Sequence, residues 1–412
     1  MNIAFISLMV PDHLKQFVNE YEITPMEEVS SFIQAELIKG LAKNGSQISV
    51  FNKLHIREYP KGFKKIFITD DDMTCENNVK IDSLPFLNIP VLSKISWYNS
   101  LKSRIKHWVD LNGNNETVVI CYACTWYNLR ILEKIKKKNN NVVTSIIIPD
   151  LPEYMYAGRK KGLKYLLRRC YLDYMNHLLK NTKKDIDMYI LFSDLMADYI
   201  GCRDKYVVME GVAKESSNIP FIPDSQRCKK RLYYGGGITE EYGVRDLVDA
   251  FLMIENTNIE LVLCGSGNAE EYVKKMAERD NRIKYLGYVS YDVAQRTLLE
   301  ADIVINPRKD SIYEFTKYSF PSKILDTLSL GKPLISYKLE GIPSEYDDYI
   351  LYVEDHNIDT LRRKIEEVCA WDNERLFLFG KNAQSFVKSN KTGFAQSNKI
   401  LKAIKMRALD RA

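Results

Sequence analysis

The sequence lacks long apolar runs, which excludes proteins that cross a bilayer as helices. No stretch of the 412 residues approaches the ~18 apolar residues that a membrane-spanning helix needs. The amino-terminal segment, residues 1–7, has no basic leader, and Pro11 and Asp12 interrupt its apolar run too early for a signal peptide. We therefore expect a cytoplasmic protein, unless it binds peripherally at the inner face of the cell membrane.

A strong excess of charge of one sign is also missing. The 59 lysines and arginines nearly balance the 54 aspartates and glutamates, which leaves a formal net charge of +5. Nucleic-acid binding would require a concentrated basic stripe. We therefore expect no nucleic-acid partner.

Patterns that bind metals are scarce. The five histidines have no metal-ligand spacing. The eight cysteines form no regular frame, and only Cys121 and Cys124 have the spacing of a redox pair; we favour buried, reduced thiols. The three aspartates at positions 70–72 favour a solvated loop over a metal site.

Short β-branched runs alternate with helical patterns in two successive series. This alternation predicts an α/β protein with two doubly wound, Rossmann-like domains. The strand-like runs of the first series are residues 3–6, 48–51, 118–121, 143–148 and 188–191. Those of the second series are residues 232–234, 259–263, 283–286, 303–305, 333–336 and 350–353. We expect domains at 1–215 and 228–385, a linker near 213–230, and a carboxy-terminal helix at 386–412 that packs on the first domain. Two such domains would face a central cleft at the carboxyl ends of their strands.

The most informative stretch is residues 306–333. Pro321 predicts the start of a helix and Gly331 its end. The amides near Ser319 and Phe320 would face a phosphate at the helix start, with Arg308, Lys317 and Lys323 as cations. Asp326, one turn into the helix, could accept hydrogen bonds from ribose hydroxyls. Taken alone, the segment favours a helix that only packs and whose cations are solvated on its outer face.

This stretch resembles the donor-binding block of family-4 glycosyltransferases, especially bacterial enzymes that build capsule, exopolysaccharide or O-antigen. The resemblance covers nearly the whole chain and implies the GT-B fold. It includes the loop of Gly236 and Gly237, the loop of Gly265, and residues 287–289 (Gly287, Tyr288 and Val289), which resemble the edge that contacts the base. In the first half, residues 148–154 resemble the loop of the acceptor-side catalytic group, which places Asp150 in that role.

Three features of the sequence depart from the family pattern. The paired glutamates of the family would fall on Tyr318 and Asp326, so we place Glu314 at the sugar hydroxyls as a second catalytic residue. The usual arginine and lysine of the phosphate loop would fall on Gly237 and Tyr242. The glycine-rich first loop is replaced by residues 8–12.

The resemblance implies a retaining transfer from a nucleotide diphosphate sugar, with UDP as the expected nucleotide and no metal or other cofactor. The acceptor would be a lipid-linked sugar or an oligosaccharide. A basic amphipathic stretch at 158–184 could contact anionic lipid, and a plain surface helix is the alternative. Two other functions remain open: a degenerate scaffold that binds the donor without turnover, and another GT-B enzyme such as a nucleotide-sugar epimerase.

Overall fold

The computed structural model describes residues 1–24, 29–69, 71–75, 78–113, 116–153, 163–213, 229–310 and 317–409. The chain divides into two compact units. Unit 1 comprises residues 1–212 and 392–412, and unit 2 comprises residues 213–391. Most of the expected linker, at 214–228, lies outside the described residues.

Unit 1 is built on an eight-stranded sheet in the order β10-β9-β8-β7-β1-β2-β5-β4. Its strands are parallel except for the β4–β5 pair. The strands are β1 (Asn2–Met9), β2 (Gln47–Leu54), β4 (Asp71–Cys75), β5 (Val79–Ser83), β7 (Thr117–Tyr122), β8 (Val143–Ile148), β9 (Met188–Leu191) and β10 (Tyr206–Val208), and β3 (Phe67–Ile68) pairs separately with β6 (Phe86–Leu87).

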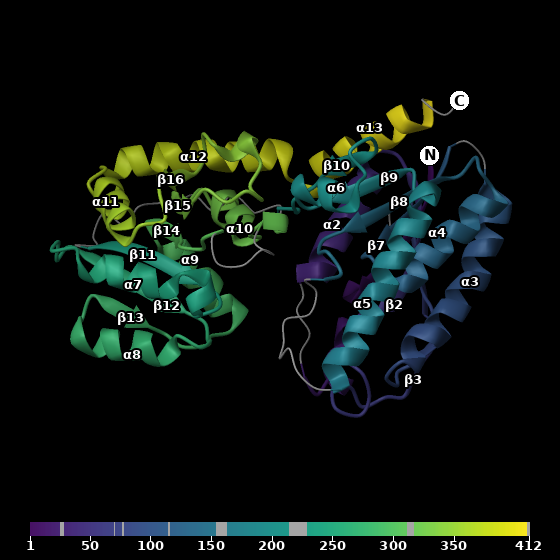
Figure 1. The fold of residues 1–412 in the computed structure, drawn as a ribbon, viewed down its shortest axis with the longest axis horizontal. Coiled ribbons are helices and arrows are strands. Elements are labelled where there is room, and N and C mark those ends of the chain that lie inside the picture. The colour runs from purple at the N-terminus through teal and green to yellow at the C-terminus, as the bar shows by residue number, and fades with distance from the viewer. Residues whose placement is uncertain are drawn as a thin grey trace. The chain divides into compact units, whose positions relative to one another are not determined.

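The central strands of unit 1 are apolar runs because helices cover both faces of a parallel sheet. Every residue of β7, β8 and β9 is buried. Figure 1 shows α3, α4 and α5 side by side, and α2 packs against α13. The helices of unit 1 are α1 (Lys15–Tyr21), α2 (Val29–Lys43), α3 (Leu92–Asn112), α4 (Trp126–Lys138), α5 (Leu163–Thr182), α6 (Leu195–Ile200) and α13 (Gly393–Leu409).

Helix α13 returns to unit 1 through an unusually close contact with α2. A Cβ atom on Gly40 would lie 2.1 Å from the carbonyl oxygen of Gly393, and one on Gly393 would lie 2.2 Å from that of Glu36. The Asn44 amide also donates to Ser397 Oγ at 2.9 Å. Only glycine permits the two helix backbones to approach so closely.

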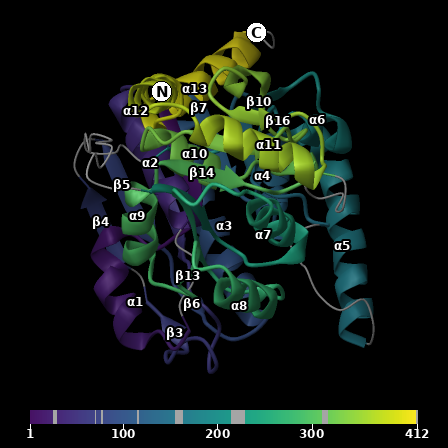
Figure 2. The same cartoon turned by 90° about the vertical axis from the view of Figure 1, so that its left-hand side faces the viewer.

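Unit 2 has a six-stranded parallel sheet in the order β13-β12-β11-β14-β15-β16. Helix α7 packs against α8 and α11, and α10 packs against α12 (Figures 1 and 2). The strands are β11 (Lys230–Gly235), β12 (Ile259–Cys264), β13 (Ile283–Tyr285), β14 (Ile303–Asn306), β15 (Leu334–Tyr337) and β16 (Leu351–Val353). The helices are α7 (Val244–Leu252), α8 (Glu270–Arg279), α9 (Tyr291–Glu300), α10 (Lys323–Ser329), α11 (Ile358–Cys369) and α12 (Asn373–Asn390).

All of the expected strand runs are strands, and two local expectations need correction. Helix α10 begins at Lys323 rather than Pro321, because residues 321 and 322 form a turn in which Ile324 N donates to Pro321 O. Asp71 and Asp72 open strand β4 instead of lying in a loop, and Asp70 lies outside the described residues. Gly331 terminates α10 with a φ of +69°, as expected.

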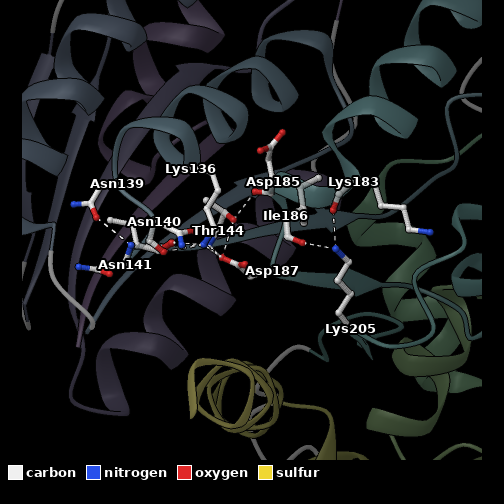
Figure 3. Close-up of polar contacts among 11 residues, drawn as sticks. Lys136, Asn139, Asn140, Asn141, Thr144, Lys183, Asp185, Ile186, Asp187 and Lys205 are labelled. Atoms are coloured by element: carbon white, nitrogen blue, oxygen red, sulfur yellow. Dashed lines mark hydrogen bonds and ion pairs between the residues drawn. The ribbon is translucent and has the colours of Figure 1, made fainter. Parts of the chain in front are cut away.

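A buried polar cluster closes the amino-terminal ends of β8 and β9 (Figure 3). Lys136 Nζ lies 2.7 Å from Asp187 Oδ2, and each side chain is 8% exposed. The same ammonium donates to the carbonyls of Asn140 and Val142, and Thr144 donates its amide and its hydroxyl to Asp187. Because every partner lies within hydrogen-bond distance, the buried charges are compensated.

Candidate active site

A cavity of about 440 Å³ lies within unit 2, at the carboxyl ends of β11, β12 and β14. This volume is in the range of small-molecule sites. Seven of the twelve residues expected to bind the donor line it: Gly236, Gly237, Gly265, Tyr288, Val289, Lys323 and Asp326. Ligands of parallel α/β sheets bind at this edge, so the cavity occupies the place where a donor is expected.

Two glycine loops form one wall of the cavity through direct backbone contact. A Cβ atom on Gly265, where φ is +132°, would lie 1.7 Å from the carbonyl oxygen of Gly236. The amide of Gly236 donates to Cys264 O, and that of Gly265 donates to Gly287 O. Gly287 therefore supports the wall without lining the cavity.

Tyrosines brace these loops from within the domain. The Tyr234 hydroxyl donates to Gly237 O at 2.8 Å, and the Tyr285 hydroxyl donates to Gly265 O at 2.8 Å. Tyr242 packs over Gly237, since a Cβ atom on that glycine would lie 2.9 Å from Tyr242 Cε2. The aromatic ring thus fills the space beside the loop where the family carries a cation.

Lys323, the first residue of α10, reaches the first glycine loop. A Cβ atom on Gly236 would lie 1.4 Å from Lys323 Nζ, so the ammonium occupies the space that a side chain at 236 would fill. The ammonium lies 5.3 Å from the centroid of the Tyr234 ring. Among the described residues, no hydrogen bond or salt bridge to this ammonium is present.

The environment of Lys323 disfavours its charge. The residue retains exposed surface because it borders the cavity, yet burial of its ammonium among protein atoms lowers the pKa to about 8. The nearby charge of Arg308 acts in the same direction, and that of Asp326 opposes it. A cation held at such a cost is suited to a bound anion, which would restore the charged form.

The other expected cations lie apart from the cavity wall. Arg308 is buried, donates from Nη2 to Ser319 Oγ at 2.7 Å, and has a pKa that burial lowers. Lys317 Nζ lies 3.6 Å from Glu340 Oε1. Phe320 is buried against Tyr346, with ring centroids 5.3 Å apart, so its side chain belongs to the core. Glu314 lies outside the described residues.

The comparisons with known proteins assign a family to unit 2. Residues 229–370 match the family described as glycosyl transferases, group 1. Unit 2 therefore carries a group 1 glycosyltransferase domain. No match is found among curated proteins.

Solved structures that are similar over nearly the full chain show that it has the GT-B fold. Sucrose-phosphate synthase from Thermosynechococcus elongatus has 13% identity and a TM-score of 0.61, with 100% of each chain covered. The lipopolysaccharide outer core galactosyltransferase WaaB has 15% identity and a TM-score of 0.59, covering 99% of this chain and 100% of that one. Anabaena HepE in complex with UDP and glucose has 14% identity and a TM-score of 0.56, covering 98% and 100%.

In unit 1 of the glycosyltransferase, Asp150 follows β8 at the carboxyl edge of the sheet. It is an exposed residue, although desolvation by the surrounding chain raises the pKa of its carboxyl. Its charge also acts on Tyr122, whose pKa burial raises to about 12. Asp150 therefore carries a carboxylate with a raised pKa at the edge of the sheet where ligands bind.

The loop that replaces the family's glycine-rich first loop is held by buried amides. Gln34 exchanges two hydrogen bonds with the backbone of Leu8, each of 2.8 Å. Asn52 Oδ1 accepts from Ser7 Oγ at 2.8 Å and from Met9 N at 3.1 Å. These two side chains form hydrogen bonds with polar groups at the end of β1. The sequence did not identify them as partners of this segment.

The remaining chemistry-bearing patterns do not form sites in the described structure. Cys121 and Cys124 are buried free thiols, and burial raises the pKa of Cys124 to about 12, so the pair is unsuited to thiolate chemistry. Within the described ranges, no group of three or more His, Cys, Asp or Glu residues could hold a metal ion. No helix in that part of the chain is long and apolar enough to cross a membrane.

Proposed function

We propose that this glycosyltransferase retains the anomeric configuration and takes its sugar from UDP. The acceptor is a lipid-linked sugar or an oligosaccharide of a bacterial surface polysaccharide. The observation that carries the proposal is the ammonium of Lys323, which lies against Gly236 in a cavity and has no anionic partner among the described residues. The diphosphate of the donor supplies that partner.

The diphosphate is the leaving group of the reaction, so negative charge increases on it in the transition state. Lys323 lies at the cavity wall, and the guanidinium of Arg308 adds positive charge behind it. Preorganised positive charge at the point where negative charge develops is commonly the largest contribution to such catalysis. Helix α10 has only seven residues, so we assign the effect to these cations rather than to a helix dipole.

Tyr288 and Asp326 extend the site to the nucleoside. Tyr288 lines the cavity and is 84% exposed, so its ring is available to stack on a base. Asp326 lines the same cavity one turn into α10, where its carboxylate can accept hydrogen bonds from ribose hydroxyls. UDP is supported by two similar structures that contain it or its sugar: HepE with UDP and glucose, and an E. coli trehalose-6-phosphate enzyme with UDP-2-fluoro glucose.

Asp150 acts on the acceptor hydroxyl in this proposal. The raised pKa of its carboxyl makes the carboxylate a stronger base toward that hydroxyl. Glu314 serves the hydroxyls of the transferred sugar in the same proposal. We expect transfer without a metal ion, so an excess of EDTA should leave the rate unchanged.

The amino-terminal half of α5 supports peripheral binding to anionic lipid. None of residues 165–174 is buried, and Leu166 is 57% exposed, three positions before the exposed Arg169 on the same helix face. Figure 2 shows α5 along one edge of unit 1. The basic residues 159–161 lie outside the described part of the chain. Such a surface can insert its leucines while its cations meet lipid phosphates.

Flotation with phosphatidylglycerol vesicles tests the lipid contact. We expect the protein to float at low salt and to remain at the bottom with phosphatidylcholine vesicles. Leu166→Ser with Leu167→Ser should abolish flotation. Leu378→Ser, at an exposed leucine on α12, is the matched control. A wild-type protein that never floats would eliminate the membrane contact and leave the donor assignment intact.

A thermal-shift screen of nucleotides, followed by product analysis, tests the reaction. UDP should raise the melting temperature because it binds only the folded protein. Slow release of free sugar from a UDP-sugar indicates a transferase, whereas release of an epimer would support the epimerase alternative. Binding without any turnover would support the degenerate scaffold.

A further inference from the structure

A second group of basic side chains lies at the carboxyl edge of the sheet in unit 1. Lys53 is the penultimate residue of β2, and His55 follows two positions later. Lys94 belongs to the first turn of α3. All three side chains are half-buried, and Lys53 Nζ lies 4.9 Å from the centroid of the buried Phe86 ring.

The basic side chains of this group are not compensated by the described residues around them. No hydrogen bond or salt bridge to Lys53 Nζ is present among those residues, and the Nδ1 atom of His55 is buried without a hydrogen-bond partner. The nearest contributing carboxylate, Glu58, accepts a hydrogen bond from Ser93 Oγ at 3.3 Å. A lysine with a purely structural role would be expected to reach carbonyls or a carboxylate, because uncompensated buried charge is costly.

The positive charges of Lys94 and Lys53 disfavour protonation of their neighbours in this group. Burial lowers the pKa of Lys53 to about 8, with the charge of Lys94 acting in the same direction. Burial and the charge of Lys53 both lower the pKa of His55. An anion that lies beside Lys53 and His55 would stabilise the protonated forms of both side chains.

The position of the group relates it to Asp150. Lys53 pairs with Leu8 in the sheet register, and the amide of His55 donates to Met9 O at 3.2 Å. The strand order places β1 and β7 between β2 and β8. At the usual strand spacing, the ends of β2 and β8 are about 14 Å apart, a distance that one or two sugar residues span.

We propose that Lys53, His55 and Lys94 form a subsite that binds an anionic group of the acceptor. The group is a phosphate or a carboxylate located one or two sugars from the hydroxyl that receives the new sugar. This inference rests on the proposed transfer to an acceptor held by unit 1. It makes an anionic acceptor the preferred substrate and a neutral oligosaccharide a poor one.

The test follows the ring signals of His55 by NMR in the full-length, ¹⁵N-labelled protein, with His55→Asn to assign them. Inorganic pyrophosphate and glucuronate are added separately in a Lys323→Met background, which weakens competing binding in the unit 2 cavity. We expect saturable shifts of the His55 signals with at least one ligand. Pyrophosphate as the stronger ligand would indicate a lipid-linked phosphate, and glucuronate an acidic sugar.

Two further substitutions separate binding from folding. Lys53→Met should raise the dissociation constant of the active ligand about tenfold, because one charge-assisted interaction is lost. Lys53→Arg should largely retain binding, and Lys102→Met, at an exposed lysine on α3, should have no effect. Absence of shifts with both ligands, or equal binding by Lys53→Met, would overturn the subsite. UDP binding, measured by thermal shift, tests the donor assignment independently.

Discussion

Lys136 and Lys323 are both lysines whose ammonium lies among protein atoms, and they differ in their partners. Lys136 Nζ meets a carboxylate and two carbonyls within 3.1 Å. Lys323 Nζ meets a glycine loop and an aromatic ring beside an open cavity. The first lysine completes a structural cluster, and the second leaves its hydrogen-bonding capacity for a ligand. The hydrogen-bond partners of the ammonium therefore distinguish a structural lysine from a ligand-binding lysine better than its burial does.

The largest expected effect tests the structural lysine. Lys136→Met leaves the carboxylate of Asp187 buried without its cation, so we expect a loss of about 3–5 kcal/mol in the free energy of unfolding. Chemical denaturation followed by circular dichroism measures this loss. Lys137→Met, which removes a solvent-exposed pair with Glu133, should leave the free energy of unfolding nearly unchanged. Equal losses in the two variants would contradict the structural role.

The second largest effect is expected on UDP affinity, when Lys323 at the cavity wall is replaced. Lys323→Met should weaken UDP binding about ten- to a hundredfold, because a charge-assisted hydrogen bond is worth about 1.5–3 kcal/mol. The melting temperature of the free protein should not fall. Isothermal calorimetry measures the affinity, and Lys317→Met, at a lysine paired with Glu340 outside the cavity lining, is the control. Unchanged affinity would remove Lys323 from the site.

The two glycine loops permit a sharper separation of stability from binding. In Gly265→Ala the new methyl meets the carbonyl of Gly236, so the backbone must shift at a cost of about 1–2 kcal/mol. In Gly236→Ala, where φ is +150°, the backbone is strained as well, and the methyl also displaces the ammonium of Lys323, so stability and UDP affinity should both fall. Denaturation and calorimetry on both variants check the contrast, and identical profiles would refute it.

The smallest effect is a pH dependence of stability. The folded pKa of Lys323, about 8, lies below its ordinary value of 10.5. Between these values the unfolded chain binds more protons at this residue, so its contribution makes the free protein more stable as pH rises. The melting temperature of the wild type minus that of Lys323→Met should therefore increase from pH 8 to 10. A difference that decreases would show that the pKa is not lowered.

The fold was largely predictable because strand runs and helix endings are local patterns. Runs such as Val143–Ile148 are apolar at every position, as a sheet covered on both faces requires. The short strands β4 and β5, the last two at one end of the sheet, were not predicted, because their polar residues lack such a run. The turn at Pro321 shifted the start of α10 by two residues, since proline fits a turn as well as a first helical position.

The site was predictable only in part, because the partner of each charged side chain comes from a segment that is distant in the sequence. The sequence offered Arg308, Lys317 and Lys323 as equivalent cations. The structure distinguishes them through Ser319, Glu340 and the cavity, respectively. Lys53 and His55 drew no attention because nothing near them in the sequence indicates that their side chains lack partners. The bracing hydroxyls of Tyr234 and Tyr285 were missed for the same reason.

The return of α13 to α2 has a consequence for the order of folding during synthesis. Unit 2 is one continuous segment, residues 213–391, whereas unit 1 needs residues from both sides of it. The ribosome therefore releases a complete unit 2 while unit 1 still exposes the glycine-lined surface of α2 that α13 covers. Until residues 393–409 emerge, that surface stays uncovered and unit 1 cannot complete its packing.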